Sequence, residues 1–169
     1  GQVALLAALA EGMVLFLVGD GEERRSLESL IRRYRFGDVV VMTGHRRDYA
    51  DFIAAADLFV LPSIADEDMP LVILAAMSLG TPVVATRIAG IPEQIRDGID
   101  GILLDPARIV EELPPVLERL LGAPHERARL AASARERYRE LFTVSAAVNA
   151  YCALYDDCLL YTSPSPRDS

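Results

Sequence analysis

The sequence contains no lysine and no tryptophan, so all 17 basic side chains are arginines. Without lysine, the chain cannot form a Schiff base with a substrate, and it cannot carry the lysine of a P-loop. Acidic residues outnumber basic ones by 25 to 17, which gives a net charge of −8 at pH 7. The chain therefore lacks the basic excess or stripe that is typical of nucleic-acid-binding proteins.

Cysteine and histidine are also scarce, with two residues of each. Cys152 and Cys158 do not form the pattern of a disulfide framework or a metal site, and we expect Cys152 in the core of the last helix. His45 and His125 have no cysteine or second histidine nearby in the sequence, so no metal site is expected.

Long apolar runs are absent as well. The longest run, at 3–10, is far shorter than the ~18 residues of a membrane-spanning helix. The chain does not open with the basic region and cleavage site of a signal peptide. These absences favour a soluble, cytoplasmic protein.

What remains is the composition of a globular protein, with 51% hydrophobic and 25% charged residues. We expect one domain, over residues 1–157. Residues 158–169 break the helical pattern and turn into a Ser/Pro run that looks like a translated sequencing adapter from a metagenomic assembly. We expect this tail to be non-native and disordered. The chain enters an apolar helical stretch at residue 2 without an initial methionine, so we expect a truncated N-terminus.

Five short apolar runs alternate with segments of helical spacing. Strands are predicted at 13–18, 38–43, 58–62, 82–86 and 101–104, and helices at 2–11, 22–35, 48–56, 70–79, 92–96, 107–121, 124–141 and 143–157. Continuous rather than alternating apolar strands indicate a parallel sheet that is buried on both faces. With right-handed crossovers, this predicts a doubly wound, Rossmann-like α/β fold.

Ligands of such sheets bind at the carboxyl ends of the strands. The most informative of these ends is the acidic loop 63–69, which precedes a helix with Pro70 predicted at its first position. The start of that helix presents backbone N–H groups to an anion such as a diphosphate. Asp66, Glu67 and Asp68 either bind sugar hydroxyls or cap the helix.

Four stretches recur together, in this order and spacing, in a known family. They are LVGDGEERRSLESLIRR, VVVMTGHRRDYADFIAAADLFVLPS, EDMPLVILAAMSLGTPVVAT and AGIPEQIRDGIDGILLDP. Through them, residues 1–157 resemble the C-terminal, nucleotide-sugar-binding half of the retaining GT-B glycosyltransferases of group 1. The resemblance implies transfer of a sugar from UDP, GDP or ADP to an acceptor hydroxyl, with retention. It implies no cofactor and no protein-bound metal.

The resemblance also implies roles for individual residues. Glu67 is the expected catalytic residue, because the family's first signature glutamate orients the donor sugar. The residues expected to bind the donor are Gly19, Gly44, His45, Arg46, Asp68, Met69, Leu71, Val72 and Ala75. Of these, Gly44, His45 and Arg46 would lie beside the nucleotide base, and the backbone amides of Met69, Leu71 and Val72 would contact sugar and diphosphate.

In two of these loops, the residues have either a role in donor binding or an ordinary structural role. Arg46 and Arg47 either contact phosphate or lie at a solvated helix start, and His45 either contacts the base or is an ordinary loop residue. The stretch from Gly90 to Glu93 either borders the donor pocket or begins a short helix, where Glu93 suits the helix dipole.

The sequence departs from the family at two places. Ala75 occupies the position of the family's second glutamate, which binds the ribose hydroxyls. A carboxylate in that position contributes roughly 1.5–3 kcal/mol, so Ala75 predicts about 10- to 100-fold weaker nucleotide binding. The family's arginine and lysine that neutralise the leaving diphosphate would precede Gly1, as would the acceptor-binding domain. We therefore expect this fragment to be inactive alone and its parent to be an enzyme.

Three alternatives remain open. The first is a non-catalytic module that holds a nucleotide sugar or a partner protein, for which Ala75 is the main support. The second is a sugar-nucleotide epimerase of the same architecture, against which the glutamate-bearing motif speaks. The third is a dinucleotide-binding domain, but Arg24 stands where its third glycine would follow Gly19 and Gly21. Peripheral membrane contact of the parent protein is also left open. By the same resemblance, the last helix of the chain, at about 143–157, would cross back to the missing domain.

Overall fold

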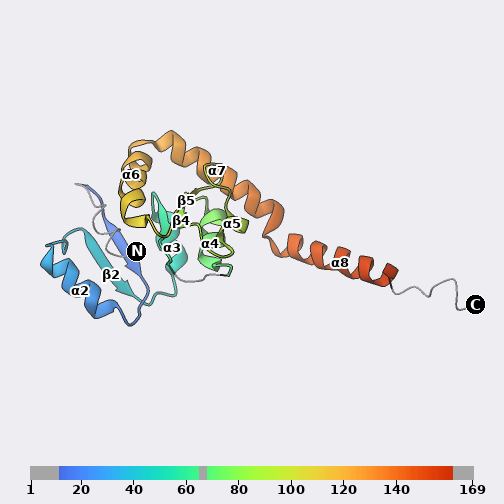
Figure 1. Cartoon of the computed structure of the whole chain (residues 1–169), viewed down its shortest axis with the longest axis horizontal. Helices are drawn as coiled ribbons and strands as arrows, with labels where there is room; N and C mark the ends of the chain where they lie inside the picture. The colour runs from blue at the N-terminus through green and yellow to red at the C-terminus, as the bar shows by residue number, and fades with distance from the viewer. Residues whose placement is uncertain (1–11, 65–67, 162–169) are drawn as a thin grey trace, which may run out of the picture.

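The computed structural model describes residues 12–64 and 68–161, with side chains described to residue 158. The elements follow one another as β1 (Leu15–Val18), α2 (Arg24–Arg33), β2 (Val40–Gly44), α3 (Tyr49–Ala55), β3 (Phe59–Leu61), α4 (Leu71–Leu79), β4 (Val83–Thr86), α5 (Ile91–Gln94), β5 (Ile102–Leu104), α6 (Ile109–Gly122), α7 (Pro124–Leu141) and α8 (Val144–Tyr161). Strands and helices alternate as the apolar runs predict (Figure 1), and the α/β fold class is confirmed.

The strands pair in parallel but form two sheets. One contains β1 and β2, with Leu15 opposite Val40, and the other has the order β3-β4-β5, with Val84 opposite Ile102. The sequence pattern predicts a single sheet. Among the described residues no strand pairing joins β1 to β3, so the predicted sheet is divided at this point.

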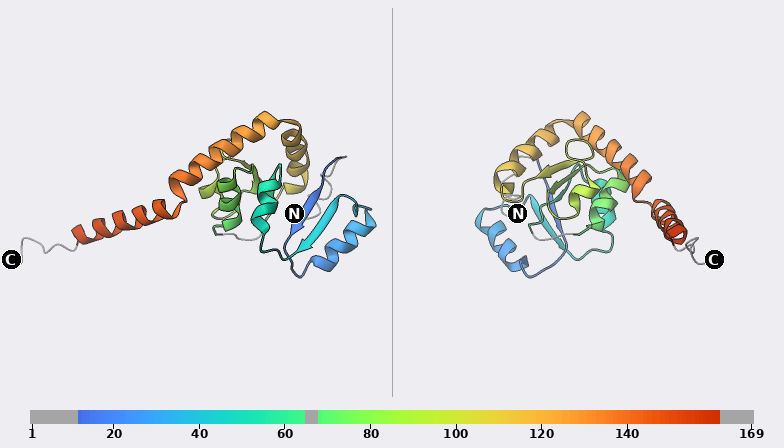
Figure 2. Two further views of the ribbon diagram at one scale, coloured as in Figure 1. Left: turned by 180° about the vertical axis from the view of Figure 1, so that it is seen from behind. Right: turned by 45° about the vertical axis from the view of Figure 1, so that its right-hand side comes forward.

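β4 is the centre of the molecule. Its four residues, Val83–Thr86, are at most 1% exposed, because β3 and β5 flank the strand and helices cover both of its faces. On one face Val84 packs with Leu113 and Leu117 of α6. On the other face Val83 packs with apolar side chains of α4 and α5. Figure 2 shows this arrangement of helices about the sheet.

β1 is less covered than its sequence predicts. Leu15 and Leu17 pack against the cluster formed by β4 and α6, whereas Phe16 and Val18 are exposed. A continuous apolar run predicts a strand that is buried on both faces. In the structure, burial alternates along the strand.

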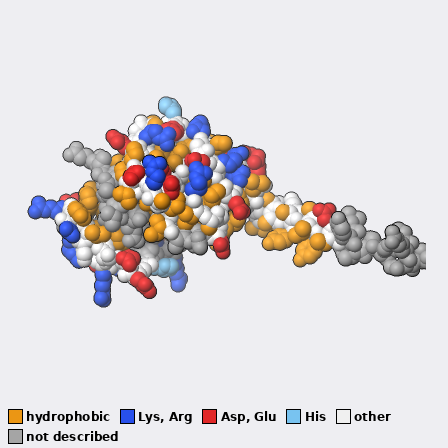
Figure 3. Space-filling model, in the orientation of Figure 1, with side chains coloured by type: hydrophobic (Ala, Val, Ile, Leu, Met, Phe, Trp, Pro, Cys, Tyr) orange, Lys and Arg blue, Asp and Glu red, His pale blue; other side chains and the backbone are white. Residues whose placement is uncertain are grey.

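α8 projects away from the rest of the molecule (Figures 1 and 2). Its large apolar side chains are exposed, and Figure 3 shows them along the projecting helix; they are Val144, Val148, Tyr151, Leu154 and Tyr155. Cys152 is also exposed, so its expected place in the core is wrong. The helix continues to Tyr161, past the boundary expected at residue 157. No helix within the described ranges has both the length and the apolarity needed to cross a membrane.

Truncation of Leu113 tests the packing of α6 on the sheet. Its side chain is fully buried, so Leu113→Ala is expected to lower the free energy of unfolding by about 3 kcal/mol. Val110 lies on the same helix but is 60% exposed, so Val110→Ala is the matched control and should change stability by less than about 0.5 kcal/mol. Urea denaturation measures both, and equal effects would contradict the assigned orientation of α6.

Candidate functional site

The first two loops at the carboxyl edge are joined to each other. The N–H of Gly19, after β1, donates a hydrogen bond to the carbonyl oxygen of Gly44, at the end of β2, over 2.9 Å. Gly19 has φ +129° and Gly44 has φ +68°, conformations that other L-residues rarely adopt. The approach of the two loops thus depends on glycine at both positions.

Charged side chains beside these loops are already paired. Arg24 lies 3.2 Å from Asp20 and 3.0 Å from Glu28. Asp20 also accepts a hydrogen bond of 2.9 Å from the N–H of Gly21, which fixes the turn after β1. The guanidinium of Arg24 therefore balances two carboxylates at the margin of the site.

Arg46 is held by Asp48 rather than directed toward an anion. Its Nε donates to Asp48 over 2.8 Å, and its guanidinium lies 5.3 Å from the ring centre of Phe52. The hydrogen bond to Asp48 raises the pKa of Arg46, and the same bond lowers the pKa of Asp48. His45 and Arg47 are exposed beside it. This pairing favours the solvated helix start, and contact of Arg46 with phosphate stays a prediction.

The amino end of α4 presents backbone donors that have no acceptor within the helix. Pro70 is the N-cap residue, one position earlier than the first helical position predicted for it, and it is buried. The N–H of Ile73 donates to the carbonyl of Pro70 over 3.0 Å. The amides of Leu71 and Val72 have no acceptor within the helix, and Pro70 provides no side-chain cap. An anion at this end would accept their hydrogen bonds and meet the positive end of the helix dipole.

The side chains around this helix start differ in exposure. Asp68, Met69 and Leu71 are exposed, whereas Ala75 is partly buried against the cluster formed by α4 and β4. Ala75 lies one turn after Leu71, so the two residues share one side of the helix. Glu67, the expected catalytic residue, lies outside the described residues, as does Asp66.

The approach to α4 is fixed by the turn before α5. A Cβ at Gly90 would lie 2.8 Å from the carbonyl carbon of Asp68 and would overlap its oxygen, so only glycine fits here. Ala89 has φ +40°, a strained conformation for alanine. Gln94 is fully buried, and its Nε2 donates to the carbonyl of Pro70 over 3.3 Å. α5 thus holds the backbone immediately ahead of α4.

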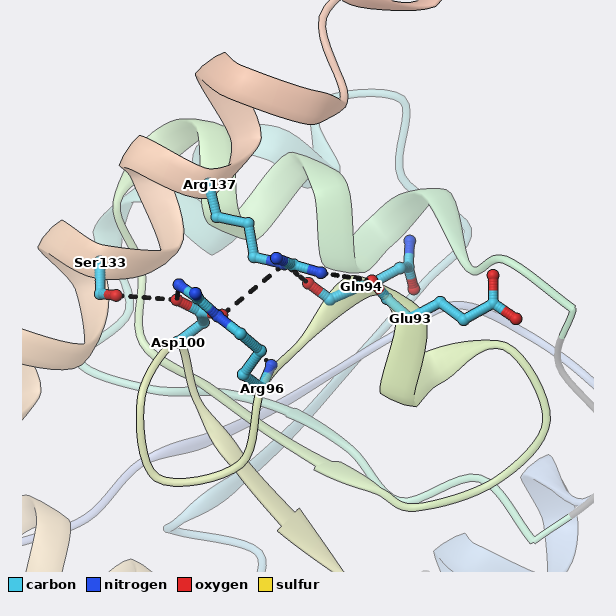
Figure 4. Close-up of polar contacts among 6 residues, drawn as sticks. All are labelled: Glu93, Gln94, Arg96, Asp100, Ser133 and Arg137. Carbon is cyan, nitrogen blue, oxygen red and sulfur yellow. Dashed lines mark hydrogen bonds and ion pairs between the residues drawn. The ribbon is translucent and has the colours of Figure 1, made fainter.

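A network of charged side chains fixes α5 against α7 (Figure 4). Asp100 accepts hydrogen bonds from Arg96 Nε at 2.6 Å, from Arg96 Nη2 at 2.8 Å and from the Ser133 hydroxyl at 2.7 Å. Arg137 of α7 lies 3.7 Å from Asp100 and donates to the carbonyl of Gln94 over 2.9 Å. The network therefore connects α7 to the residue that holds Pro70.

The Asp100 carboxylate stays ionised in this network although it is completely buried. Burial by itself raises the pKa of Asp100, but the hydrogen bonds from Arg96 and Ser133 outweigh it and hold the pKa below the usual value. The same contact raises the pKa of Arg96.

Two of the expected donor-binding residues share one cavity. Gly19 and Val72 both line a cavity of about 950 Å³ that also runs along β1 and β3. The structure therefore brings the loop after β1 and the amino end of α4 to the same opening. Among the described residues, no group of three or more His, Cys, Asp or Glu side chains could hold a metal ion.

Sequence reasoning missed the parts of the site that come from distant segments. It left open whether Gly90 borders the pocket, and it did not identify the role of Gln94. The pairing of Arg96 with Asp100 has the i, i+4 spacing of a helical ion pair, although both residues lie outside helices. Nothing in the sequence indicates that Ser133 and Arg137 would join them.

The family is established by sequence comparison. A sequence model described as Glycosyl transferases group 1 matches residues 2–123. The chain therefore belongs to the glycosyl transferases group 1 family, as its four motifs indicate.

Individual relatives agree with this assignment. The chain is 35% identical over 156 residues to the lipopolysaccharide core biosynthesis glycosyltransferase LpsE of Rhizobium meliloti, with 91% of this chain and 45% of LpsE covered. It is 32% identical over 145 residues to the N-acetyl-alpha-D-glucosaminyl L-malate synthase of Bacillus anthracis, with 86% and 38% covered. The structure of Anabaena HepE with UDP-glucose has a TM-score of 0.83 at 28% identity, with 93% and 45% covered. The chain spans less than half of the length of these relatives.

Removal of the Asp100 charge tests the network. Asp100→Asn is expected to lower the free energy of unfolding by about 2 kcal/mol near pH 7, because hydrogen bonds to a charged group are lost. The folded-state pKa of Asp100 is lowered, so its stabilisation is complete above the unfolded value of about 3.9 and is lost as the pH falls through the folded pKa. The difference between the two proteins should therefore shrink on acidification.

Urea denaturation at several pH values measures this effect. Asp57→Asn is the matched control, because Asp57 is an exposed aspartate paired with Arg127, and its loss should cost less than about 0.5 kcal/mol. A stability difference for Asp100→Asn that does not depend on pH would contradict the assigned ionisation.

Proposed function

We propose that this chain is the donor-binding half of a retaining glycosyltransferase. A nucleotide diphosphate sugar would bind at the carboxyl edge of the strands, with its diphosphate at the amino end of α4. Two observations carry the proposal: Val72, in the first turn of α4, lines the same cavity as Gly19, and the amides of Leu71 and Val72 have no acceptor within the helix.

The relatives support a nucleotide-sugar donor. HepE, at 28% identity, has been crystallised with UDP-glucose, and at 27% identity with UDP. LpsE is a glycosyltransferase of lipopolysaccharide core biosynthesis. We take UDP as the first nucleotide to test and leave the sugar and the acceptor open.

In the proposed reaction, the bond between the anomeric carbon and the diphosphate breaks while the acceptor hydroxyl attacks from the same face and gives its proton to the departing diphosphate oxygen. The amides at the start of α4 would stabilise the negative charge that develops on the leaving diphosphate. Glu67 would orient the donor sugar, as the family resemblance implies. The acceptor would bind to the other half of the parent protein. The exposed apolar side of α8, which includes Val148 and Tyr155, supports a contact of this helix with that half.

One observation favours a second candidate function. The methyl group of Ala75 cannot accept hydrogen bonds from ribose hydroxyls, as the family's second glutamate would. A module that holds a nucleotide sugar or a partner protein without turnover would tolerate this residue. The two candidates differ in the activity of the parent protein, because only an enzyme would release UDP from the donor in the presence of an acceptor.

Isothermal titration calorimetry of the chain with UDP tests the proposed donor site. UDP is expected to bind, and uridine is expected to bind at least about tenfold more weakly, because it lacks the anion for the amino end of α4. NAD serves as the control for a dinucleotide-binding domain. Equal affinity for UDP and uridine, or binding of NAD alone, would contradict the proposal.

Restoring a carboxylate on α4 should strengthen nucleotide binding. Ala75→Glu is expected to raise the affinity for UDP about 10- to 100-fold, because the carboxylate would accept the ribose hydroxyls. Ala75→Gln is the matched control, since it has the same shape without the charge and should give a smaller gain. No gain with any nucleotide diphosphate would show that the ribose does not lie beside this residue.

The close approach at Gly90 should matter for the same ligand. Gly90→Ala would displace Asp68 and the start of α4, so we expect at least about a tenfold loss of UDP affinity. Gly122→Ala is the control, because a Cβ at Gly122 meets nothing within 4 Å. Calorimetry at equal protein concentration compares the two variants, and unchanged affinity for Gly90→Ala would place the diphosphate elsewhere.

A further inference from the structure

We propose that the outer face of α2 binds the surface of a membrane that contains anionic phospholipids. This basic face consists of Arg25, Arg32 and Arg33 on the helix and of Tyr34 and Arg35 directly after it. Its ligand is the layer of lipid phosphates, which the four cations would meet together. The basic face lies outside the proposed donor site, and its binding to a membrane does not depend on donor binding.

The helix turns this side toward solvent. Leu27 and Ile31 are the buried residues of α2, and Ile31 packs with Val40 of β2. Arg25 and Arg32 are seven residues apart, so they lie on one side of the helix, which is directed away from Leu27 and Ile31. All four arginines of the basic face are exposed, and Figure 3 shows basic side chains that project from this end of the molecule.

The arginines of the basic face have no carboxylate partner. On α2, ion pairs are formed by Arg24, with Asp20 and Glu28. The four arginines of the basic face form none with any residue that the structure describes. Arg108 and Arg119, at the two ends of α6, are also exposed but lie against glutamates. The protein itself therefore does not neutralise the positive charge of the basic face.

The stability of α2 explains only part of this charge. Cations in the last turn of a helix interact favourably with the helix dipole, which accounts for Arg32 and Arg33. The dipole does not account for Arg25, because the first turn favours a carboxylate and contains none. Arg35 has φ +60°, a conformation that glycine would adopt without strain. Two of the four cations thus stand where local structure favours another residue.

The net charge of the chain does not show this local concentration. Residues 24–35 contain five arginines and one glutamate, a net charge of +4 in a chain whose net charge is −8. α7 is also rich in arginine, but Glu126, Glu136 and Glu140 lie among its arginines. At physiological ionic strength, charges more than about 8 Å from a surface are largely screened. α2 lies at the end of the molecule opposite to α8 (Figures 1 and 2), so it can meet a plane with the acidic remainder turned away.

An aromatic ring beside the arginines indicates which anionic surface is bound. Tyr34 is 55% exposed, and the guanidinium of Arg33 lies 5.7 Å from the centre of its ring. A tyrosine ring has an apolar body and a polar tip, and such rings gather at the headgroup level of bilayers. Clusters of basic residues at that level bind anionic lipids. The phosphates of a nucleic-acid duplex would engage the arginines but would leave the ring without a partner.

Membrane contact at this face would also place the proposed donor site. Because Arg25 and Arg32 both belong to the basic face, α2 would lie along the membrane. The loop of Gly19 leads into the amino end of α2, so it would lie within about one helix diameter, ~10 Å, of the lipid surface. Under the proposed function, on which this consequence rests, a membrane-borne acceptor would be close to the donor.

Sedimentation of the full chain with vesicles tests the inference. The chain is expected to bind vesicles of phosphatidylglycerol mixed with phosphatidylcholine, and not vesicles of phosphatidylcholine alone. Raising the salt concentration from about 0.1 M to about 1 M shortens the screening length from about 10 Å to about 3 Å, so binding should weaken at least about tenfold. Equal binding to neutral vesicles, which the exposed apolar side of α8 would give, would overturn the inference.

Paired substitutions locate the contact. Arg32→Gln with Arg33→Gln should weaken vesicle binding about 10- to 30-fold, because each cation at an anionic surface contributes about fivefold. Arg108→Gln with Arg139→Gln is the matched control, since it removes the same charge from exposed arginines elsewhere and should weaken binding less than about threefold. Equal losses in the two double variants would show that net charge governs binding and would refute the inference.

UDP calorimetry on the same variants reports the donor site separately. The affinity for UDP should be the same with and without Arg32→Gln and Arg33→Gln, because neither residue lies at the proposed donor site. Loss of vesicle binding with unchanged UDP binding is the expected result. A chain that binds vesicles through the basic face but does not bind UDP would contradict the proposed function and would still support the membrane contact.

A fluorescent reporter tests whether the face touches lipid. The chain contains no tryptophan, so Tyr34→Trp introduces a single one. Its emission is expected to move to shorter wavelength with anionic vesicles and to be quenched by brominated lipids, because the indole would enter the headgroup layer. Tyr155→Trp, on the exposed side of α8, is the matched control and should show neither change. An unchanged emission of Tyr34→Trp would overturn the inference, whatever Tyr155→Trp shows.

Two soluble anions address other sources of phosphate. Glycerol phosphate has the chemistry of a headgroup without the surface, and at millimolar concentration it should not displace the chain from vesicles, because one phosphate engages few of the cations. Displacement would indicate a discrete phosphate site. A single-stranded oligonucleotide can stack on Tyr34. Tighter binding of the oligonucleotide than of vesicles, lost with Arg32→Gln and Arg33→Gln, would assign the face to nucleic acid, and either result would contradict the membrane contact.

Discussion

The burial of β4 is the constraint on which the rest of the described structure depends. β4 has a parallel strand on each side and helices over both faces, so no solvent reaches its backbone or its side chains. Because parallel strands point the same way, the carboxyl ends of β3, β4 and β5 lie along one edge. The loop that leads to α4 and the turn that leads to α5 leave from that edge, and for this reason they meet. The proposed donor site is thus a consequence of how one strand is packed.

The contact between these two loops is stabilised by a buried carboxylate, whose burial costs free energy. A buried carboxylate loses its hydration, and Asp100 recovers that loss only because Arg96 and Ser133 donate hydrogen bonds to it. An apolar residue could pack there more cheaply, but it could not orient Arg96 and Arg137. Arg137 in turn holds the backbone of α5, and Gln94 of α5 holds Pro70. Specific positioning of a helix start is a reason to retain buried charge where stability alone would not require it.

The sequence predicted the elements well because each depends on local pattern. All five apolar runs became strands, and the boundaries differ by two residues or fewer at each end. The division into two sheets could not be predicted in this way, because the pairing of a strand depends on which strands lie beside it in space and not on its own sequence pattern. For the same reason the exposure of Phe16 was unexpected. The exposure of Cys152 on α8 had a similar origin, since an apolar helical pattern does not tell which surface covers the helix.

The candidate site was predicted in part. Gly19 and Val72 lie at one cavity, as their positions after a strand and at a helix start suggest. Arg46 was a reasonable candidate for phosphate binding, but Asp48, two residues later, is close enough to pair with it. The close approach of Gly90 to Asp68 joins segments 22 positions apart in the chain. Sequence spacing carries no information on such a contact, and a glycine before a helix can equally serve as an N-cap or as a turn residue.

In the proposed function, the positive charge that the site needs for binding a diphosphate is smaller than the positive charge it needs for catalysis. The amino end of α4 offers about half an elementary charge and two amides without an acceptor within the helix, which suffices to hold an anion. A leaving diphosphate carries more negative charge than this, and each missing donor to such a charge costs about 10²- to 10³-fold in rate. Arg24 and Arg46, beside the first two loops, each already balance a carboxylate. The described edge is therefore better equipped to bind a nucleotide diphosphate than to expel one. Under the proposed function, further positive charge has to come from the rest of the parent protein.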